Sequence, residues 1–284
     1  MKKNFLISGG FGHVGAELAK DLAVKNNVTV IDNGLLGRSQ DYLDDLGIKI
    51  INDSVENLFK YEIECEYFYH LGEYSRVEQS LSEPDLVFRN NIGSIIPVLD
   101  FCNKKKAKLI YTGSSTKFAD DGKASQTNPY AITKKINTEI VNSYCKFCNL
   151  EYAIVYLNNV YGQGELGTGK YATVIEKFLR LKEKNMPLIV TMPGSQRRAF
   201  THIHDTINAL KIVGNSGIGD GFMICNDMDY SVLEVAKYIS DDIEFVTSNK
   251  ANRISGVLNN QKLKKLGWKP SVNLFDYLDS RLDK

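Results

Sequence analysis

The sequence predicts an α/β fold with a doubly wound parallel sheet and a smaller, mixed C-terminal lobe. Two observations support this: short apolar strands alternate with helical patterns through the first half of the chain, and a glycine-rich turn follows the first strand. Because crossovers between parallel strands are right-handed, the Rossmann topology is the default arrangement. The alternation loosens after Asn158, so residues 1–158 are expected to form the first lobe, and residues 159–284 a second lobe interleaved with the last strands of the first.

The strands and the first helix follow from local patterns. Val14, Leu18 and Leu22 recur at helical spacing, which predicts a helix over Val14–Lys25 directly after the glycine turn. Short apolar runs bounded by polar residues predict strands. These runs are Phe5–Ser8, Val28–Ile31, Ile48–Asn52, Tyr67–Leu71 and Lys108–Thr112.

Two long helices are expected next. Glu83–Lys105 carries apolar residues along its faces, with Pro97 inside it as a point where it can kink. Tyr130–Phe147 begins directly after Pro129, a residue that suits the first turn of a helix. Shorter helices are expected in the second lobe, at Thr173–Lys184, Asp205–Val213, Val232–Ser240 and Leu274–Leu282.

The composition excludes several classes of protein. At 284 residues and 43% hydrophobic, the chain can bury a full core. Its 35 basic and 34 acidic residues give a net charge of +1, which argues against binding to nucleic acid or to an acidic membrane. No apolar run approaches the ~20 residues that span a bilayer. The apolar stretch at the start is too short for the core of a signal peptide, so we expect a cytoplasmic protein.

The cysteines and histidines do not predict a metal site. Cys145 and Cys148 form a CxxC with no second pair of ligands, which indicates two thiols on a helix. His202 and His204 form an HxH without a third ligand nearby. His70 ends a strand and is expected to have a structural role. We therefore expect neither a bound metal nor a disulfide framework.

The turn after the first strand has the spacing of a phosphate-binding loop. Gly10, Gly12 and Gly15 satisfy GxGxxG, and Gly9, Gly12 and Gly15 satisfy GxxGxxG. Glycine allows the backbone to approach a pyrophosphate, and the helix start that follows offers free N–H groups and a positive dipole end. A strand before the loop and a helix after it make the match more specific.

Acidic residues at two strand ends bear on the choice of cofactor. Asp32 closes the second strand, where a carboxylate can bind the ribose hydroxyls of NAD and repel the 2′-phosphate of NADP. Arg38 lies in the loop beyond and would favour NADP, but the position of Asp32 favours NAD. Asp53 follows the third strand and is either an adenine contact or an ordinary surface residue.

Ser114, Tyr130 and Lys134 form a candidate proton-transfer set. A tyrosine alone is a poor base near neutral pH, because its pKa in water is about 10. A nearby ammonium favours the phenolate, and positions four apart share one face of a helix, so Lys134 can act on Tyr130. Ser114 follows the strand Lys108–Thr112, where its hydroxyl can bond the oxygen that Tyr130 protonates or deprotonates.

Taken in order along nearly the whole chain, these motifs resemble the extended short-chain dehydrogenase/reductase family, and within it the nucleotide-sugar epimerase/dehydratase group that includes UDP-glucose 4-epimerases. The matching pieces are Ser8–Gly15, Val30–Asn33, His70–Gly72, Asn90–Gly93, Gly113–Phe118, Tyr130–Lys134, Asn159–Gly162, Arg198–His202 and Leu266–Trp268.

The resemblance implies a tightly held NAD in the first lobe and a nucleotide-diphosphate sugar bound by the second. It implies that Tyr130 is the acid/base, Lys134 its partner and Ser114 the donor to the substrate hydroxyl. The expected cofactor-binding residues are Gly9, Gly12, His13, Val14, Gly15, Asp32, Asn33, Asp53, Ser54, Leu71, Asn90, Tyr130 and Lys134. The expected substrate-binding residues are Ser75, Ser115, Asn159, Arg198 and Arg253.

The residues after Ser114 help to choose the reaction. Family dehydratases carry Asp-Glu there and decarboxylases tend to carry a Glu, whereas this chain has Ser115 and Thr116. Neither hydroxyl can serve as a base near neutral pH, which favours a 4-epimerase, although a carboxylate from elsewhere, such as Glu73, could substitute. Gly72-Glu73-Tyr74 stands where the family usually has Ala-Ala or Ala-Gly, and Tyr74 and Arg76 are either sugar-pocket residues or structural ones.

We therefore expect an NAD-dependent nucleotide-sugar epimerase that acts at C4 through a transient 4-keto sugar. The alternatives are a C4 dehydrogenase or ketoreductase, a 4,6-dehydratase, and a non-catalytic NAD-sensing protein. The two long helices resemble those that pair in family dimers, so a homodimer is expected.

Overall fold

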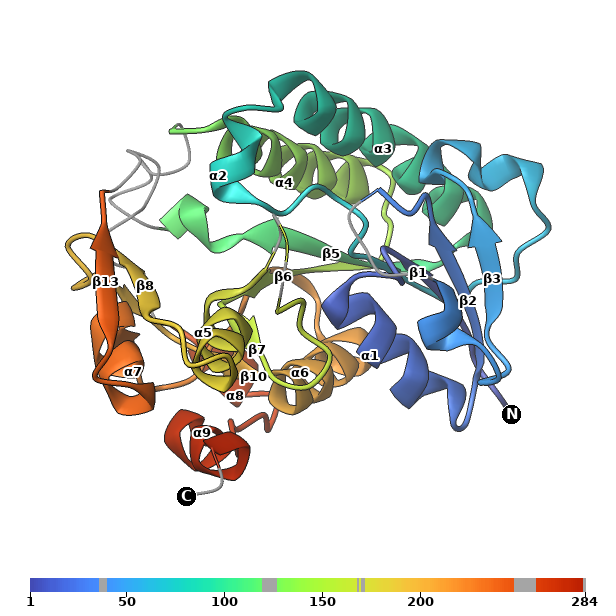
Figure 1. Ribbon diagram of the computed structural model, residues 1–284. Helices are drawn as coiled ribbons and strands as arrows, with labels where there is room; N and C mark the ends of the chain where they lie inside the picture. Colours follow the sequence, from blue (N-terminus) through green and yellow to red (C-terminus); the bar gives the residue numbers. More distant parts are fainter. Residues whose placement is uncertain (36–39, 119–126, 168, 170–171, 248–258, 283–284) are drawn as a thin grey trace.

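The computed structural model describes residues 1–35, 40–118, 127–167, 169, 172–247 and 259–282. These residues build a seven-stranded parallel sheet with the strand order β11-β6-β5-β4-β1-β2-β3 (Figure 1). The order reverses between β1 and β4, which is the switch point where α/β proteins bind ligands. The strands are β1 Asn4–Ser8, β2 Asn27–Asp32, β3 Lys49–Asn52, β4 Tyr67–His70, β5 Lys108–Ser114, β6 Tyr152–Leu157 and β11 Gly219–Ile224.

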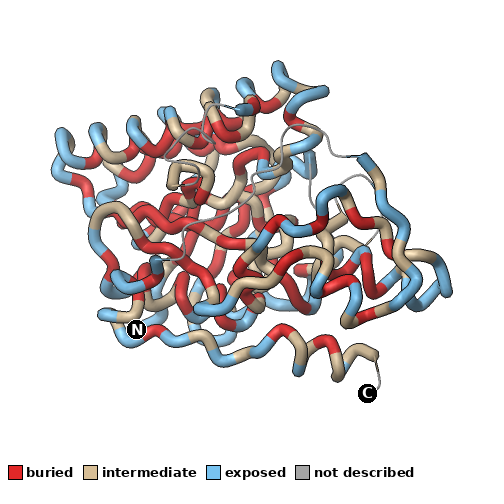
Figure 2. The backbone as a smooth tube through the Cα atoms, turned by 90° about the vertical axis from the view of Figure 1, so that its left-hand side faces the viewer, coloured by how far each residue is buried: buried red, intermediate tan, exposed pale blue. Residues whose placement is uncertain are grey.

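Helices cover both faces of this sheet. Helices α3 and α4 lie side by side on one face, and α1 and α6 pack together on the other (Figure 1). Each pair encloses an apolar cluster against the sheet, so the strands are buried on both sides, as the tube coloured by burial shows (Figure 2). The bounds are α1 His13–Ala23, α2 Val77–Ser80, α3 Pro84–Lys105, α4 Pro129–Phe147 and α6 Ile203–Ser216, with 3₁₀ turns at Gln40–Leu43, Val55–Lys60 and Ser115–Phe118.

A third apolar cluster organises the C-terminal part of the chain. Its helices are α5 Val174–Glu183, α7 Val232–Ile239, α8 Gln261–Lys264 and α9 Leu274–Leu282. Its short strands pair as β7 Val160–Tyr161 with β10 Thr201–His202, β8 Leu188–Thr191 with β13 Ile243–Val246, and β9 Arg197–Arg198 with β12 Tyr230–Ser231. The predicted α/β class with a doubly wound sheet and a mixed C-terminal part is confirmed.

Several element bounds differ from the predictions for physical reasons. Strand β5 continues to Ser114 instead of ending at Thr112, because Gly113 and Ser114 still pair with β6. Strand β6 was not among the expected strands; it is buried along nearly its whole length and so lacks the alternation of a half-exposed strand. Strand β11 and helix α6 come from beyond residue 158 yet belong to the main sheet and its cover. The division into two lobes at that residue stays a prediction.

The C-terminal segment is fixed to helix α6 by one carboxylate and one indole. Trp268 is buried, and its Nε1–H donates to the backbone oxygen of Asp205 at 3.0 Å. The Asp205 carboxylate accepts from the Ser271 hydroxyl at 2.6 Å and from the Val272 N–H at 3.0 Å. The Leu-Gly-Trp motif therefore helps to attach the C-terminal segment to helix α6.

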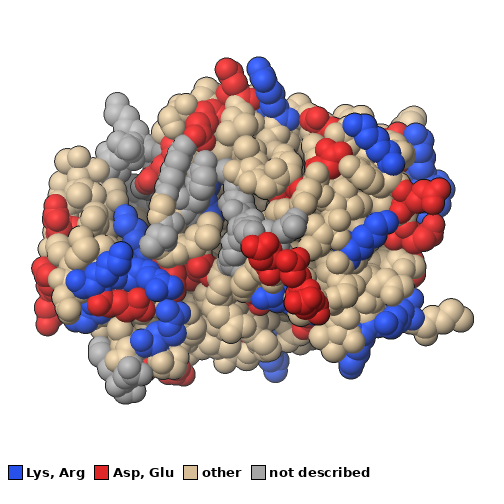
Figure 3. Space-filling model, turned by 45° about the vertical axis from the view of Figure 1, so that its right-hand side comes forward, with Lys and Arg blue, Asp and Glu red and all other residues tan. Residues whose placement is uncertain are grey.

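The molecular surface mixes both signs of charge. On the face drawn in Figure 3, Lys and Arg side chains are interspersed with Asp and Glu side chains. No helix among the described residues is long and apolar enough to cross a membrane.

Candidate active site

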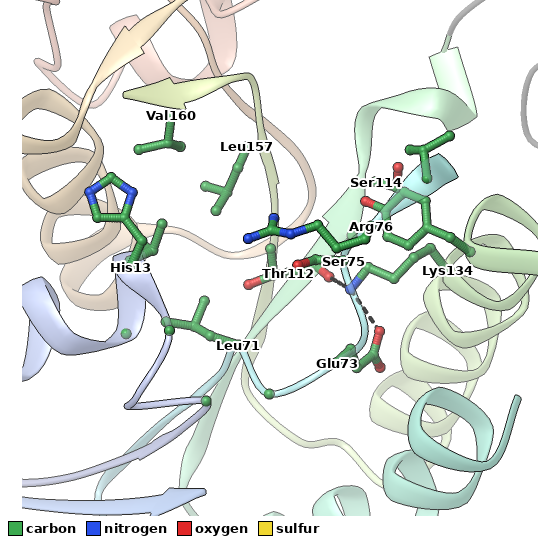
Figure 4. Close-up of a pocket in the computed structure, with 18 of the residues that line it drawn as sticks. His13, Leu71, Glu73, Ser75, Arg76, Thr112, Ser114, Lys134, Leu157 and Val160 are labelled. Carbon is green, nitrogen blue, oxygen red and sulfur yellow. Dashed lines mark hydrogen bonds and ion pairs between the residues drawn. The ribbon is translucent and has the colours of Figure 1, made fainter. Parts of the chain in front are cut away.

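A cavity of about 490 Å³ opens at the carboxyl ends of the central strands, beside the switch point of the sheet. Its lining comes from both parts of the chain: the glycine turn, the loop after β4, the end of β5, helix α4 and the segment after β6 (Figure 4). A second cavity of about 300 Å³ adjoins it between β2, β3 and α3, and both share Gly9, Asp32 and Asn90. Together the two cavities form one elongated site.

The glycine turn is shaped for close backbone approach. Gly9 has φ +75°, and a side chain there would meet the backbone of Leu71 and Gly72 at 2.7 Å. A Cβ at Gly15 would lie 2.1 Å from the Gly9 carbonyl oxygen. Helix α1 starts at His13 with no side chain capping it and no acidic residue in its first turn. Its N–H groups therefore remain available to a phosphate.

Two backbone N–H groups hold the Asp32 carboxylate at the cavity wall. The carboxylate accepts from the Phe11 N–H at 2.9 Å and from the Gly34 N–H at 2.8 Å. Burial raises the pKa of Asp32, and these two N–H groups offset part of that rise. A carboxylate fixed in this place fits the ribose hydroxyls of NAD, and the glycine turn fits its pyrophosphate. Arg38, the residue that would favour NADP, lies outside the described residues.

Asp53 and Ser54 line the second cavity, where the adenosine end of a dinucleotide is expected. The Asp53 carboxylate already accepts from the Ser54 N–H, from Asn57 at 2.8 Å and from the Tyr61 hydroxyl at 2.7 Å. These donors lower the pKa of Asp53, with Asn57 contributing most. Asp53 thus shapes this loop, and its expected contact with adenine stays a prediction.

The three proposed catalytic residues line the first cavity together. Ser114 ends β5, and its Oγ lies 2.8 Å from the Thr116 hydroxyl. Tyr130 opens helix α4, directly after Pro129, and Lys134 follows one turn later on the same helix. The Asn128 side chain caps this helix by accepting from the Ala131 N–H, which fixes the turn that carries Tyr130.

Lys134 is buried and held by a buried carboxylate. Its Nζ lies 2.6 Å from Glu73 Oε2 and also donates to the backbone oxygen of Thr112. Figure 4 shows Glu73 below Lys134, on the side away from Ser114. Burial raises the pKa of Glu73, but the charge of Lys134 and the nearby His70 outweigh it, so the pKa falls below its usual range. The sequence indicated Lys134 but not this partner.

Four of the five residues proposed to bind substrate lie at the cavity wall. Ser75, Ser115, Asn159 and Arg198 all line the first cavity. Asn159 has φ +37° and donates to the Ala199 carbonyl, which fixes the strand segment that carries Arg198. Arg253 lies outside the described residues. The binding roles of these residues stay predictions.

Two residues after β4 have different surroundings. Tyr74 is fully buried and its hydroxyl donates to Glu83 at 2.7 Å, so the idea that Tyr74 lines the sugar pocket is wrong. The buried Asn91 side chain bonds the backbone N–H and carbonyl of Tyr74 and the Thr133 hydroxyl. These bonds fix the Tyr74 backbone while the Tyr74 ring lies in the interior. Arg76 does line the cavity, and its guanidinium points into it (Figure 4).

Several lining residues were not among the predicted site residues. Thr112, Thr127, Leu157, Val160 and Thr173 come from strand ends and helix starts that face the cavity. A strand-end position was the one available signal for Thr112. Leu157 ends β6, a strand that was not predicted, and Thr173 reaches the site through the fold of the C-terminal part. His70 is buried, and its Nδ1 lies 2.6 Å from the Ser8 hydroxyl, so it links the neighbouring strands β4 and β1. Within the described residues no three His, Cys, Asp or Glu side chains gather as a metal site would need.

The sequence model of the NAD dependent epimerase/dehydratase family matches residues 5–224 of the chain. The chain belongs to this family. It is therefore an enzyme of the NAD-dependent epimerase/dehydratase superfamily, and its cofactor is NAD. The predicted family and cofactor are confirmed.

Relatives within the family have different activities. UDP-glucuronic acid decarboxylase 1 of Danio rerio is 26% identical over 308 residues, which cover 99% of this chain and 72% of the relative. UDP-glucose 4-epimerase of Thermotoga maritima, crystallised with UDP-glucose, superposes with a TM-score of 0.88 at 21% identity, covering 99% and 97% of the two chains. The Thermus thermophilus UDP-glucose 4-epimerase complex with NAD gives a TM-score of 0.87 at 19% identity, covering 98% and 97%. At these identities the structural likeness establishes the fold.

Proposed function

We propose that this enzyme is a nucleotide-sugar 4-epimerase, which inverts C4 through a transient 4-keto sugar. The observation that supports epimerisation most directly is the set of residues after the catalytic serine. Ser115 and Thr116 stand where a carboxylate would be needed to remove the proton at C5 or to assist loss of a carboxyl group. Among the described residues, the carboxylates that line the first cavity are Asp32 and Glu73.

Neither of these carboxylates is placed to act as that base. Asp32 lies at the end of β2, beside the glycine turn and away from Ser114. Glu73 is buried, and its oxygens accept from Lys134, Tyr111 and Asn137 at 2.6 to 3.0 Å. Glu73 is therefore engaged within the protein and does not replace the missing base.

Each residue of the site has one task in this reaction. Tyr130 takes the proton from the sugar O4 and later returns it, while the Ser114 hydroxyl holds that oxygen in place. Bound NAD supplies the hydride acceptor and donor at C4. Arg198 and Asn159 hold the diphosphate, so that the freed 4-keto sugar can turn over while the nucleotide stays bound. No cofactor is consumed, because the hydride returns to the opposite face of the same sugar.

A panel of UDP-, GDP- and dTDP-sugars tests this function. An epimerase yields the C4 epimer without net change in NADH absorbance. A C4 dehydrogenase or ketoreductase changes NADH absorbance, a 4,6-dehydratase gives a product lighter by one water, and a decarboxylase releases carbon dioxide. One of those three results in place of epimerisation would reject the proposal and identify the enzyme's actual reaction.

Tyr130→Phe tests the proton-transfer role. We expect kcat to fall by roughly 10²- to 10⁴-fold, because the phenolic oxygen is lost and nothing else replaces it. Tyr144→Phe, a tyrosine on the same helix that does not line either cavity, serves as the matched control and should keep parental activity. Full activity in Tyr130→Phe would mean either that a different residue is the acid/base or that the protein is a non-catalytic NAD sensor.

A further inference from the structure

The turn at residues 114–116, which lines the first cavity, is packed against the ring of a tyrosine that lines neither cavity. Tyr156 on β6 is buried, and a Cβ at Gly113, directly before this turn, would lie 2.6 Å from its ring. At the other end of the turn, the Phe118 ring packs edge-on against the same ring, with the two centroids 4.8 Å apart. The Tyr156 ring therefore contacts the chain both before and after the residues that face the cavity.

One carboxylate bonds both this tyrosine and the turn. Asp220, near the start of β11, accepts from the Tyr156 hydroxyl at 2.6 Å and pairs with Lys117 Nζ at 2.8 Å. It also accepts from Asn142 Nδ2 at 3.1 Å. Burial works against the charge of Asp220, but Lys117, Tyr156 and Asn142 outweigh it, so the pKa of Asp220 falls below its ordinary value.

The same carboxylate connects the turn to helix α4. Asn142 lies on this helix, which also carries Tyr130 and Lys134. Figure 4 shows Ser114 and Lys134 on the same side of the cavity. Proton transfer needs its groups in a defined geometry, and a displacement of about 1 Å can slow a reaction about a hundredfold. The bonds of Asp220 therefore bear on the relative position of the two elements that hold the proposed catalytic residues.

We propose that Asp220 and Lys117 are positioning residues that hold residues 114–116 against helix α4, so that Ser114 and Tyr130 meet the same sugar oxygen. The inference rests on the proposed roles of Ser114 and Tyr130 and adds a requirement for them. Neither Asp220 nor Lys117 lines either cavity, so both act through the segments that they hold. Their loss should slow the chemical step and leave the binding of the nucleotide nearly unchanged.

Steady-state kinetics of three variants test this inference. Lys117→Met keeps the aliphatic stem and removes the ammonium, Lys117→Arg keeps a positive charge, and Asp220→Asn removes the negative charge. Lys264→Met is the matched control, because Lys264 and Lys117 are both 30% exposed, Lys264 Nζ lies 2.6 Å from Asp227, and Lys264 lines neither cavity. The bound NAD and the melting temperature of each variant are measured as well, so that a loss of folded enzyme is not read as slower chemistry.

We expect kcat of Lys117→Met to fall roughly tenfold while KM for the nucleotide sugar stays within about threefold, as for an interaction that acts only in the transition state. Lys117→Arg should recover most of the rate, because a guanidinium can still pair with the carboxylate. The double variant Lys117→Met, Asp220→Asn should be no slower than Asp220→Asn alone, since the two charges act as one unit.

A kcat of Lys117→Met within about twofold of the parent, or an equal fall in Lys264→Met, would overturn the inference. A raised KM at unchanged kcat would overturn it too, because it would assign Lys117 to nucleotide binding. The same criteria apply to Asp220→Asn if Lys117→Met does not fold. The kinetics are measured on whichever product the sugar panel identifies. Failure of the proposed function, read from that product, is therefore distinct from failure of this inference.

Discussion

At the scale of single residues, we propose that the carboxylate of Asp32 selects NAD over NADP. Two backbone N–H groups hold it at the end of β2, and each of its oxygens retains capacity for a ribose hydroxyl. The 2′-phosphate of NADP would meet this negative charge at close range. On this proposal, selectivity for NAD depends on one side chain with a fixed position.

Asp32→Ala should weaken NAD binding by roughly tenfold to hundredfold, because hydrogen bonds to a charged group are lost. NADP should lose less or gain, since the repulsion of its phosphate disappears. Calorimetric titration of both dinucleotides measures the ratio. Asp21→Asn, an exposed acidic residue on α1 that pairs with Lys211, should leave that ratio unchanged. A ratio that also stays constant in Asp32→Ala would show that selectivity lies elsewhere.

Single residues also show which contacts a local sequence pattern can predict and which it cannot. The spacing of Tyr130 and Lys134 on one helix indicates that they are neighbours, because helical geometry fixes positions four apart. The Glu73–Lys134 pair joins residues 61 positions apart, and no local pattern contains that information. The sequence left Tyr74 open between a sugar-pocket residue and a structural one, and the structure decides for the latter, because its hydroxyl bonds Glu83 in the interior.

At the scale of elements, the segment after β7 contains a buried carboxylate, Glu165, whose charged form is disfavoured by the loss of water. Glu165 Oε2 accepts from the Gly162 N–H at 2.9 Å, while its Oε1 is buried with no hydrogen-bond partner among the described residues. Burial raises the pKa of Glu165 to about 7, although Thr173 and the Gly162 N–H lower it in part. The folded protein therefore holds this proton to a higher pH than the unfolded chain.

The sign of the pH dependence follows from this raised pKa. Glu165 contributes its full stability below the unfolded pKa of about 4.3, and that contribution is lost as the pH rises through about 7. Glu165→Gln, which needs no proton, should melt a few degrees above the parent at pH 8 and differ little at pH 4. Calorimetric melting across that range is the measurement. A difference that is the same at both pH values would contradict the assignment.

The attachment of the C-terminal segment to helix α6 is the second feature at this scale. Trp268→Ala should lower the free energy of unfolding by about 3–5 kcal/mol, because a buried indole and its hydrogen bond to Asp205 are lost. Urea denaturation measures the change. Phe147→Ala, at a position that is 92% exposed, should alter stability by less than about 0.5 kcal/mol. A Trp268 variant as stable as that control would mean that the segment is not needed for folding.

At the scale of the whole molecule, helices α3 and α4 present an uncovered apolar surface. Phe88 and Ile96 on α3 are 40% and 52% exposed, and Ile136 on α4 is 39% exposed. Helices α3 and α4 lie side by side, which makes these residues candidates for one continuous surface that a second copy could cover (Figure 1). The predicted homodimer remains a proposal with this surface as its interface.

Light scattering of the purified enzyme should give twice the mass of one chain. The double variant Ile96→Lys, Ile136→Lys should raise the dissociation constant by more than tenfold, since each buried apolar side chain stabilises an interface by about 1.5–3 kcal/mol. Ile218→Lys, exposed elsewhere on the surface, should leave the mass unchanged. A parent enzyme that elutes as a monomer at all concentrations would reject this interface.

The sequence by itself determined the α/β class, the glycine turn before α1, NAD as the cofactor and the grouping of Ser114, Tyr130 and Lys134 at one cavity. Those features follow from short-range periodicity, strand ends and helical spacing, which a chain carries locally. The tertiary structure alone decided that Glu73 forms an ion pair with Lys134, that Tyr74 faces the interior and that β11 completes the sheet. Each of these joins segments far apart in the chain, and packing selects such partners only when the whole chain is folded.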